Sequence, residues 1–214
     1  MSNQTQKFVK GTLILSIAGL LAKVLSAFFR VPLTALIGDE GIGYYGLAYP
    51  IYTLFSAIAV MGIPSTIAKM VAEKRVCGEQ MEAHKIFTHT LKLMLIIGTV
   101  MSGVVFFGAP FIIKALDWEP GSIYSLWGLA LSPIFVCIMG VYRGYFQGMQ
   151  DMMPTAISQV AENAGRVLGG LALAVYFMPD VAKAAGGASF GGVIGGVFGS
   201  IVLLAMYMKK RNSI

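Results

Sequence analysis

Long apolar stretches dominate this chain of 214 residues and decide what it can fold into. A helix needs about 20 apolar residues to cross the hydrocarbon core of a bilayer. Six stretches have that length, namely 11–37, 42–67, 90–113, 122–146, 154–177 and 186–208. They occupy most of the chain and leave no soluble domain of useful size. We therefore predict an all-α integral membrane protein, a six-helix membrane lobe over 11–208.

The placement of basic residues sets the expected orientation of these six spans. If the N-terminus is cytoplasmic, eleven basic residues lie in inner segments, against only Lys114 and Lys183 in outer loops. The eleven are Lys7, Lys10, Lys69, Lys74, Arg75, Lys85, Lys92, Arg143, Lys209, Lys210 and Arg211. This bias predicts cytoplasmic termini, 1–10 and 209–214, in a multi-pass protein of the bacterial plasma membrane. It also explains the basic isoelectric point, so no nucleic-acid partner is needed.

The longest segment outside the spans is a cytoplasmic loop at about 69–89. Its basic residues favour a short helix along the inner membrane surface, held by anionic lipid headgroups. His84 and His89 are five residues apart and fall on different faces of such a helix, with no cluster of cysteines or carboxylates beside them. We therefore predict neither a metal site nor a cofactor.

Two basic residues, Lys23 and Arg30, lie inside the first span. A charge at the centre of a membrane helix costs about 2.5–3.5 kcal/mol on insertion scales, so two of them mark a functional face. They belong to a polar stripe with spacings of three or four, which consists of Thr12, Ser16, Gly19, Lys23, Ser26, Arg30 and Thr34. The opposite side is apolar. The stripe predicts a wet cavity on one side of this helix.

The fifth span carries a second polar stripe, made of Thr155, Gln159, Glu162, Arg166 and Gly170, with Asn163 beside it. Glu162 and Arg166 are four residues apart and can pair on the helix. Such a pair can be a structural ion pair that neutralises itself or a part of a binding site. The two stripes together contain three positive charges, on Lys23, Arg30 and Arg166, and one negative charge, on Glu162. The surplus of two positive charges favours an anionic ligand. Arginine binds phosphate well because its planar fork grips two oxygens.

In this hypothesis Lys23, Arg30 and Arg166 attract the anion, while Gln159, Glu162 and Asn163 tune the cavity or couple it to an ion. The spans also contain prolines that are expected to bend them, at Pro32, Pro50, Pro64 and Pro133. These bends can act as hinges, although proline is also simply commoner in membrane helices.

The sixth span has a glycine at every fourth position, namely Gly187, Gly191, Gly195 and Gly199. Such a small-residue ladder lets another helix approach closely. Its partner can lie within this chain or in a second copy. No nucleotide-binding loop, zinc-protease motif or nucleophile elbow occurs in the sequence, so we predict a protein that is not an enzyme.

Several motifs resemble the stage V sporulation protein B family. They are Gly11–Leu15 leading to Lys23, Arg30–Leu33, Gly41–Tyr45, Ala48–Tyr52, Arg143–Met152 and Pro154–Gln159, followed by Glu162 and Arg166. The resemblance covers nearly the whole chain. That family belongs to the multidrug/oligosaccharidyl-lipid/polysaccharide exporter superfamily, which also holds lipid II and O-antigen flippases.

The resemblance implies transport of a polyprenyl-pyrophosphate-linked saccharide for cell-wall, peptidoglycan or polysaccharide synthesis, or in sporulation. It also implies that Arg30 matches a cavity position of the first helix, while Lys23 replaces a commoner arginine. Family members have two six-helix lobes, and this chain resembles the N-terminal lobe only. We therefore expect a fragment or truncated product, or a half-transporter that obtains a second lobe from another chain. Two alternatives remain: an ion-coupled multidrug exporter and a non-transporting membrane scaffold.

Overall fold

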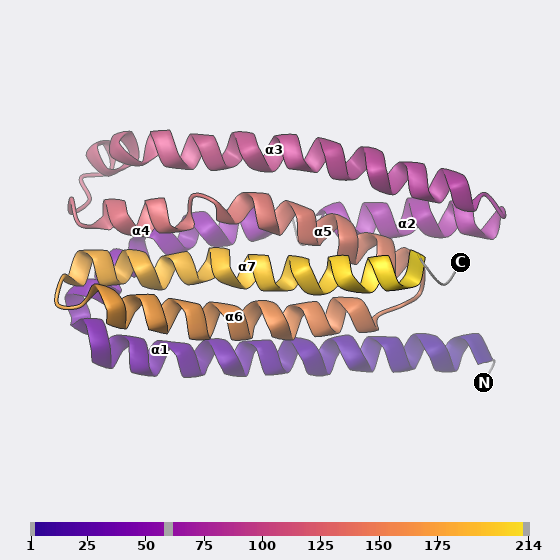
Figure 1. Ribbon diagram of the computed structural model, residues 1–214, viewed down its shortest axis with the longest axis horizontal. Helices are drawn as coiled ribbons and strands as arrows, with labels where there is room; N and C mark the ends of the chain where they lie inside the picture. The colour runs from indigo at the N-terminus through magenta and orange to yellow at the C-terminus, as the bar shows by residue number, and fades with distance from the viewer. Residues whose placement is uncertain (1–2, 58–61, 212–214) are drawn as a thin grey trace.

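The computed structural model describes residues 3–57 and 62–211 as helices joined by short turns (Figure 1). The helices are α1 (Asn3–Ala57), α2 (Ile63–Val76), α3 (Gln80–Ala115), α4 (Ser122–Leu129), α5 (Ser132–Gly148), α6 (Met153–Phe177) and α7 (Val181–Arg211). Four stretches are long and apolar enough to cross a membrane: Gly11–Leu54, Gln80–Ala115, Ser122–Gly148 and Val181–Lys210. The predicted all-α class is confirmed for this part of the chain. The basic side chains of Lys7, Lys10 and Arg211 lie outside what the structure describes.

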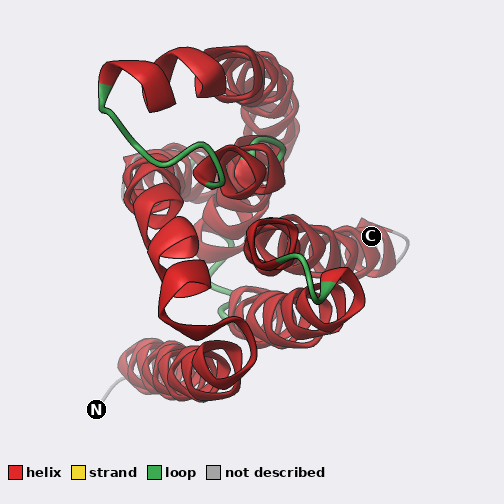
Figure 2. Cartoon of the chain, turned by 90° about the vertical axis from the view of Figure 1, so that its left-hand side faces the viewer, coloured by secondary structure: helices red, strands yellow, loops and turns green. Residues whose placement is uncertain are grey.

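Helix α1 consists of two limbs that meet at Gly38. This glycine has φ 65° and ψ −172°, a combination that only glycine adopts without strain. The chain reverses direction there, and the second limb runs back behind α7 toward α2 (Figure 1), rising from the lower edge to the upper left in Figure 2. A single residue therefore separates the first two predicted spans, in place of a turn over 38–41.

The segment 69–89 differs from the surface helix that its charges predict. Helix α2 continues to Val76, Gly78 reverses the chain with φ 78°, and α3 begins at Gln80. Ala83 and Phe87 of α3 are buried in one core cluster with Ile67 and Val71 of α2. Because this apolar contact extends to the turn, the segment folds as a helical hairpin. The predicted third span, 90–113, is accordingly part of a longer helix.

The four prolines that were expected to bend helices fall into two groups, at the start of a helix and inside one. Pro64 and Pro133 lie in the first turn of α2 and α5, where a missing N–H costs no hydrogen bond. The predicted fourth span is thereby divided into α4 and α5. Pro32 and Pro50 instead lie inside α1, and the helix continues through both. In α1 the break falls at Gly38.

Helix α7 is the central helix of the bundle, and α6 is its main partner. The glycine ladder faces α6: a Cβ added at Gly187 would lie 3.0 Å from Leu173 Cβ, and one at Gly191 would lie 2.6 Å from Gly170 Cα. The neighbouring row faces the other way, since a Cβ at Gly196 would lie 2.6 Å from Phe135 Cβ of α5. Two faces without side chains therefore let α7 approach both α6 and α5. The ladder's partner lies within this chain.

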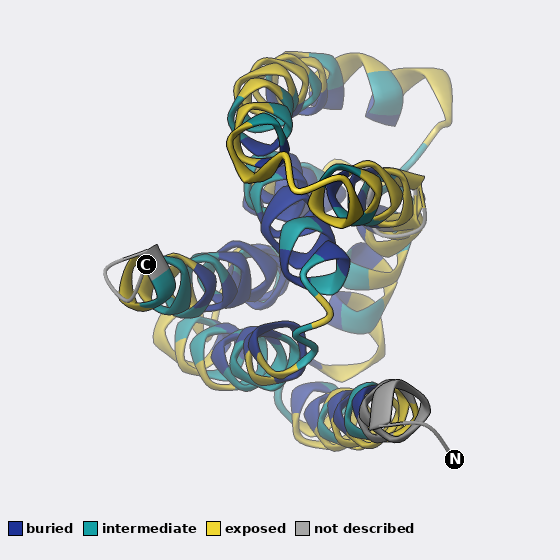
Figure 3. Cartoon of the chain, turned by 90° about the vertical axis from the view of Figure 1, so that its right-hand side faces the viewer, coloured by how far each residue is buried: buried dark blue, intermediate teal, exposed yellow. Residues whose placement is uncertain are grey.

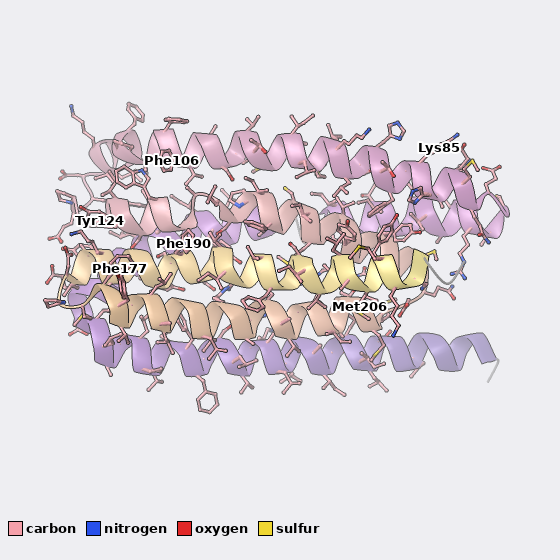
Figure 4. The ribbon with its side chains drawn as sticks, viewed as in Figure 1. Lys85, Phe106, Tyr124, Phe177, Phe190 and Met206 are labelled. Carbon is pink, nitrogen blue, oxygen red and sulfur yellow. The ribbon has the colours of Figure 1, made fainter. Side chains whose placement is uncertain are left out.

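Exposed apolar side chains cover the outside of the bundle. Viewed from the right, buried residues concentrate on the central helices, whereas exposed ones follow the outer faces (Figure 3). Side chains along the first limb of α1 point away from the bundle (Figure 4), and Phe28 and Val31 there are more than two-thirds exposed. Apolar surface of this extent is typical of a lipid-facing helix.

Candidate functional site

A groove of about 520 Å³ lies between the two limbs of α1 and helix α6. Two guanidinium groups line it, Arg30 from the first limb and Arg166 from α6. The remaining lining residues are Ser26, Ala27, Phe29, Leu33, Ile42, Tyr45, Gly46, Tyr49, Pro50 and Val167. The structure thus brings together two of the three basic residues that the sequence assigned to an anion.

Arg30 is exposed and lies on the edge of this groove. It also borders a shallower depression with Val31 and Thr34 on the same limb. Lys23 is exposed as well, seven residues earlier on the same limb and outside the residues that line the groove. Seven residues correspond to about 10 Å along a helix. Ser26, the first residue of this limb that lines the groove, follows Lys23 by about one helical turn.

Arg166 is held by contacts on two sides. Its Nη2 donates to the hydroxyl of Tyr52, which lies on the second limb of α1, and to Glu162 Oε1 at 3.3 Å. Its guanidinium carbon lies 4.8 Å from the centre of the Tyr52 ring. The side chain is only 14% exposed. Arg166 therefore presents its charge to the groove from a fixed position.

Arg143 is a basic residue that the sequence analysis did not assign to the site. The sequence counted it among the inner basic residues; in the structure its side chain is buried and donates from Nη2 to Glu162 Oε2 at 2.9 Å. Its Nε donates to Ser158 Oγ at 3.0 Å. Glu162 therefore lies between two arginines, each bonded to a different oxygen. Only Arg143 and Arg166 contact Glu162 among the described residues. With Arg143 added to Lys23, Arg30 and Arg166, four basic residues are counted against one carboxylate, so the predicted surplus of two becomes three.

The other polar residues predicted on α6 lie on the same helix face but differ in their contacts. Ser26 Oγ donates to Asn163 Oδ1 at 3.2 Å, which joins the two predicted polar stripes directly. Asn163 Nδ2 donates to the Gln159 carbonyl oxygen at 2.8 Å. The buried Oε1 of Gln159 has no protein partner among the described residues. A neutral polar edge therefore borders the charged groove.

The motif from Arg143 to Met152 owes its glycines to close helix contacts. A Cβ added at Gly144 would lie 2.8 Å from the Pro64 carbonyl oxygen, and one at Gly148 would lie 2.8 Å from that of Ala68. Helix α2 therefore packs backbone to backbone against α5. At the end of the motif, Lys210 pairs with Asp151 at 2.9 Å. The motif joins α5, α2 and α7 at the end that holds both termini (Figure 1).

The described residues contain no group of three His, Cys, Asp or Glu side chains that could hold a metal ion. Cys77 is exposed and Cys137 is buried, and both are free thiols. The polar side chains that line the groove are therefore two guanidinium groups and the hydroxyls of Ser26, Tyr45 and Tyr49. These groups bind anions and polar neutral molecules by hydrogen bonds.

Solved transporter structures share this fold. An outward-facing multidrug resistance MATE family transporter of the MOP superfamily superposes with a TM-score of 0.79 at 15% identity, covering 99% of this chain and 48% of that one. A MOP superfamily transporter from Pyrococcus furiosus gives 0.74 at 15% identity, covering 95% and 47%. The bundle therefore has the fold of about half of such a transporter.

Sequence relatives give the family. Stage V sporulation protein B of Bacillus subtilis is 32% identical over 210 residues, which is 97% of this chain and 40% of that protein. The lipid II flippase MurJ of the same organism is 29% identical over 220 residues, again 97% and 40%. The chain thus spans about two-fifths of the length of these relatives. The model of the polysaccharide biosynthesis protein family matches residues 8–214. The chain is a multi-pass protein of the bacterial cell membrane and belongs to the polysaccharide biosynthesis protein family.

Proposed function

We propose that this chain forms one six-span lobe of a flippase that moves a polyprenyl-pyrophosphate-linked saccharide across the plasma membrane by alternating access. The observation that carries the proposal is the shared groove of Arg30 and Arg166. Among the described residues, Glu162 is the one carboxylate that contacts Arg166, and it is already bonded to Arg143. The groove therefore retains positive charge, and a pyrophosphate supplies the oxygens that two guanidinium groups bind best.

The proposed topology follows from the positions of the chain ends. Both termini lie at one end of the bundle (Figure 1), as an even number of spans requires. The excess of basic residues in that half assigns this end to the cytoplasm. The six spans are then the two limbs of α1, the second with α2, followed by α3, α4 with α5, α6 and α7.

A second six-helix lobe completes the proposed transporter, from the same longer polypeptide or from another chain. The solved transporter chains are about twice as long as the part that this chain covers. The lobe contributes binding and positioning without bond chemistry, so it is a transporter component and not an enzyme. Pro64 and Pro133, in the first turns of α2 and α5, are the proposed hinges of its movement, together with Pro32 and Pro50 in α1.

Binding of a polyprenyl pyrophosphate to the chain in nanodiscs tests the proposal. Arg30→Ala removes a charge-assisted bond of about 1.5–3 kcal/mol, so we expect affinity to fall at least about tenfold. Lys114→Ala, which removes an exposed charge at the end of α3, is the matched control. In a longer chain with both lobes, Arg30→Ala abolishes transport at unchanged expression.

Equal affinity of the Arg30→Ala variant would contradict the proposal. Binding of a fluorescent organic cation to the same groove would instead support the multidrug exporter alternative. Glu162 is clamped by two arginines, which disfavours a cationic ligand there. Crosslinking between copies with no lipid binding would support the scaffold alternative.

A further inference from the structure

We infer that Tyr49, supported by Tyr45 and Tyr52, forms a stacking platform for the first sugar ring of the ligand. The inference rests on the proposed function and assigns the saccharide end of the ligand to specific residues. Tyr45, Tyr49 and Tyr52 follow at spacings of four and three, so they share one face of the second limb of α1. Tyr45 and Tyr49 both line the groove of Arg30 and Arg166.

The aromatic rings form a continuous row across the groove. Phe29 of the first limb contacts Tyr45 edge to face, with 6.2 Å between ring centres. Tyr45 and Tyr49 are 5.8 Å apart, and Tyr49 and Tyr52 are 6.1 Å apart. These distances are typical of aromatic pairs that stabilise one another. The row thus leads from the first limb, beside Arg30, to the ring that Arg166 covers.

The members of this row differ in exposure in a way that suits a binding surface. Phe29 is 5% exposed and Tyr52 is 8% exposed, so the ends of the row are fixed in the protein. Tyr49 between them is 40% exposed. Its neighbours hold the ring in place, and its free surface opens onto the groove. A preorganised ring of this kind loses little entropy when a ligand stacks on it.

The chemistry of an aromatic face limits what it can hold beside two arginines. The face of the ring carries partial negative charge, so it attracts cations and C–H groups and does not attract phosphate oxygens. Arg30 and Arg166 repel a cationic ligand from the same groove. A pyranose ring offers C–H groups on its faces and hydroxyls around its rim. In the proposed ligand it is bonded directly to the pyrophosphate that the arginines attract.

The groove also has room and hydrogen-bonding groups for a sugar. Its volume of about 520 Å³ falls within the range of about 300–1,000 Å³ found for small-molecule sites. Ser26 lines it, and the Ser26 hydroxyl contacts the amide of Asn163. The Ser26 hydroxyl oxygen can still accept a hydrogen bond from a sugar hydroxyl, which an apolar lipid chain cannot offer. The apolar chain has the exposed outer surface of α1 instead.

A comparison of two lipids on the chain in nanodiscs tests the inference. The probes are polyprenyl-pyrophosphate-N-acetylglucosamine and the same polyprenyl pyrophosphate without sugar. We expect Tyr49→Ala to weaken binding of the sugar-bearing lipid about 3- to 10-fold and to leave the bare lipid unchanged. Tyr49→Phe keeps the ring and retains most of the affinity. Tyr176→Ala, which removes an exposed tyrosine of α6 outside the groove, is the control.

The outcomes separate this inference from the proposed function. Equal loss for both lipids, or no loss for either, would overturn the stacking platform, and Tyr49 would then be a membrane-interface tyrosine. Failure of the proposed function would be seen in a different measurement. In that case the lipid without sugar would bind the Arg30→Ala variant as tightly as the wild type. If Tyr49→Phe binds the sugar-bearing lipid nearly as tightly as the wild type, the aromatic ring and not the hydroxyl of Tyr49 provides the affinity.

Discussion

Arg143 and Glu162 form an ion pair of 2.9 Å whose side chains are only 9% and 12% exposed. The pair joins α5 to α6, and Glu162 also bonds to Arg166 at the groove. Removing one partner of a buried pair leaves the other charge uncompensated, which costs far more than loss of an exposed pair. The position of Arg166 therefore depends on a residue that does not line the groove.

Arg143→Met is predicted to destabilise the bundle by about 3 kcal/mol, because it removes a charge that Glu162 needs and keeps the volume of the side chain. Thermal unfolding in detergent measures this effect. The matched control is Lys85→Met, since Lys85 forms an exposed pair with Glu82 at 2.8 Å. We expect the control to melt at the wild-type temperature. Adding Glu162→Gln to Arg143→Met should recover part of the loss, and a double variant worse than the single one contradicts this account.

Gly191→Ala tests the close contact of α7 with α6. The new Cβ would lie 2.6 Å from Gly170 Cα and 2.7 Å from the Arg166 carbonyl oxygen, and neither backbone atom can turn away. We expect a loss of about 1–3 kcal/mol from overpacking. Gly103→Ala in α3 is the control, because nothing lies within 4 Å of its added Cβ. A stable Gly191→Ala variant would show that the two helices can separate without loss.

Gly38→Ala tests the junction between the limbs of α1. At φ 65° and ψ −172° the new side chain meets no atom within 4 Å, so any loss comes from backbone strain alone. We expect a cost of about 1–3 kcal/mol. Gly43→Ala lies in the second limb, also in open space, and should leave the melting temperature unchanged or raise it. If both variants melt alike, the junction is unstrained and the assigned role of Gly38 is wrong.

Asp180 precedes α7 and should titrate below its ordinary pKa of 3.8. The Lys183 side chain and backbone N–H bond to its carboxylate, which favours the charged form and lowers the pKa. A lowered folded pKa means that this stabilisation is present above pH 3.8 and is lost as the pH falls through the folded pKa. The carboxyl carbon chemical shift measures the titration. Lys183→Ala should raise the pKa of Asp180, and an unchanged midpoint contradicts the assignment.

The sequence predicted those parts of the site that follow helix periodicity. Glu162 and Arg166 pair as their spacing of four allows. Ser26 of the first polar stripe contacts Asn163, which lies beside the second. Lys23 also belongs to the first stripe but lies outside the groove lining, since a stripe gives direction around a helix and no position along its partner. The class of the fold followed from the apolar stretches alone.

Arg143 and Tyr52 could not be placed in the same way. Arg143 is near the end of an apolar span, where a basic residue ordinarily reaches out to the interface. Its burial depends on Ser158 and Glu162, which belong to α6. The residue pattern of α5 alone cannot predict these partners on another helix. The neighbouring Gly144 marks close packing with α2 and does not indicate the α6 partners of Arg143. Similarly, the 69–89 hairpin depends on contacts between Phe87 and α2, which outweigh its charged composition.

The glycines of α7 have no side chain, so the contacts of α7 at the centre of the lobe lack both side-chain volume and alternative side-chain rotamers. Helices that meet through side chains can slide by exchanging one set of χ angles for another, but a contact between backbones has no second arrangement to adopt. We therefore expect helices α6 and α7 to move as one unit, together with Arg166 and Glu162 of α6. We expect a change in the width of the groove to come from its other wall, the limbs of α1 on either side of Gly38.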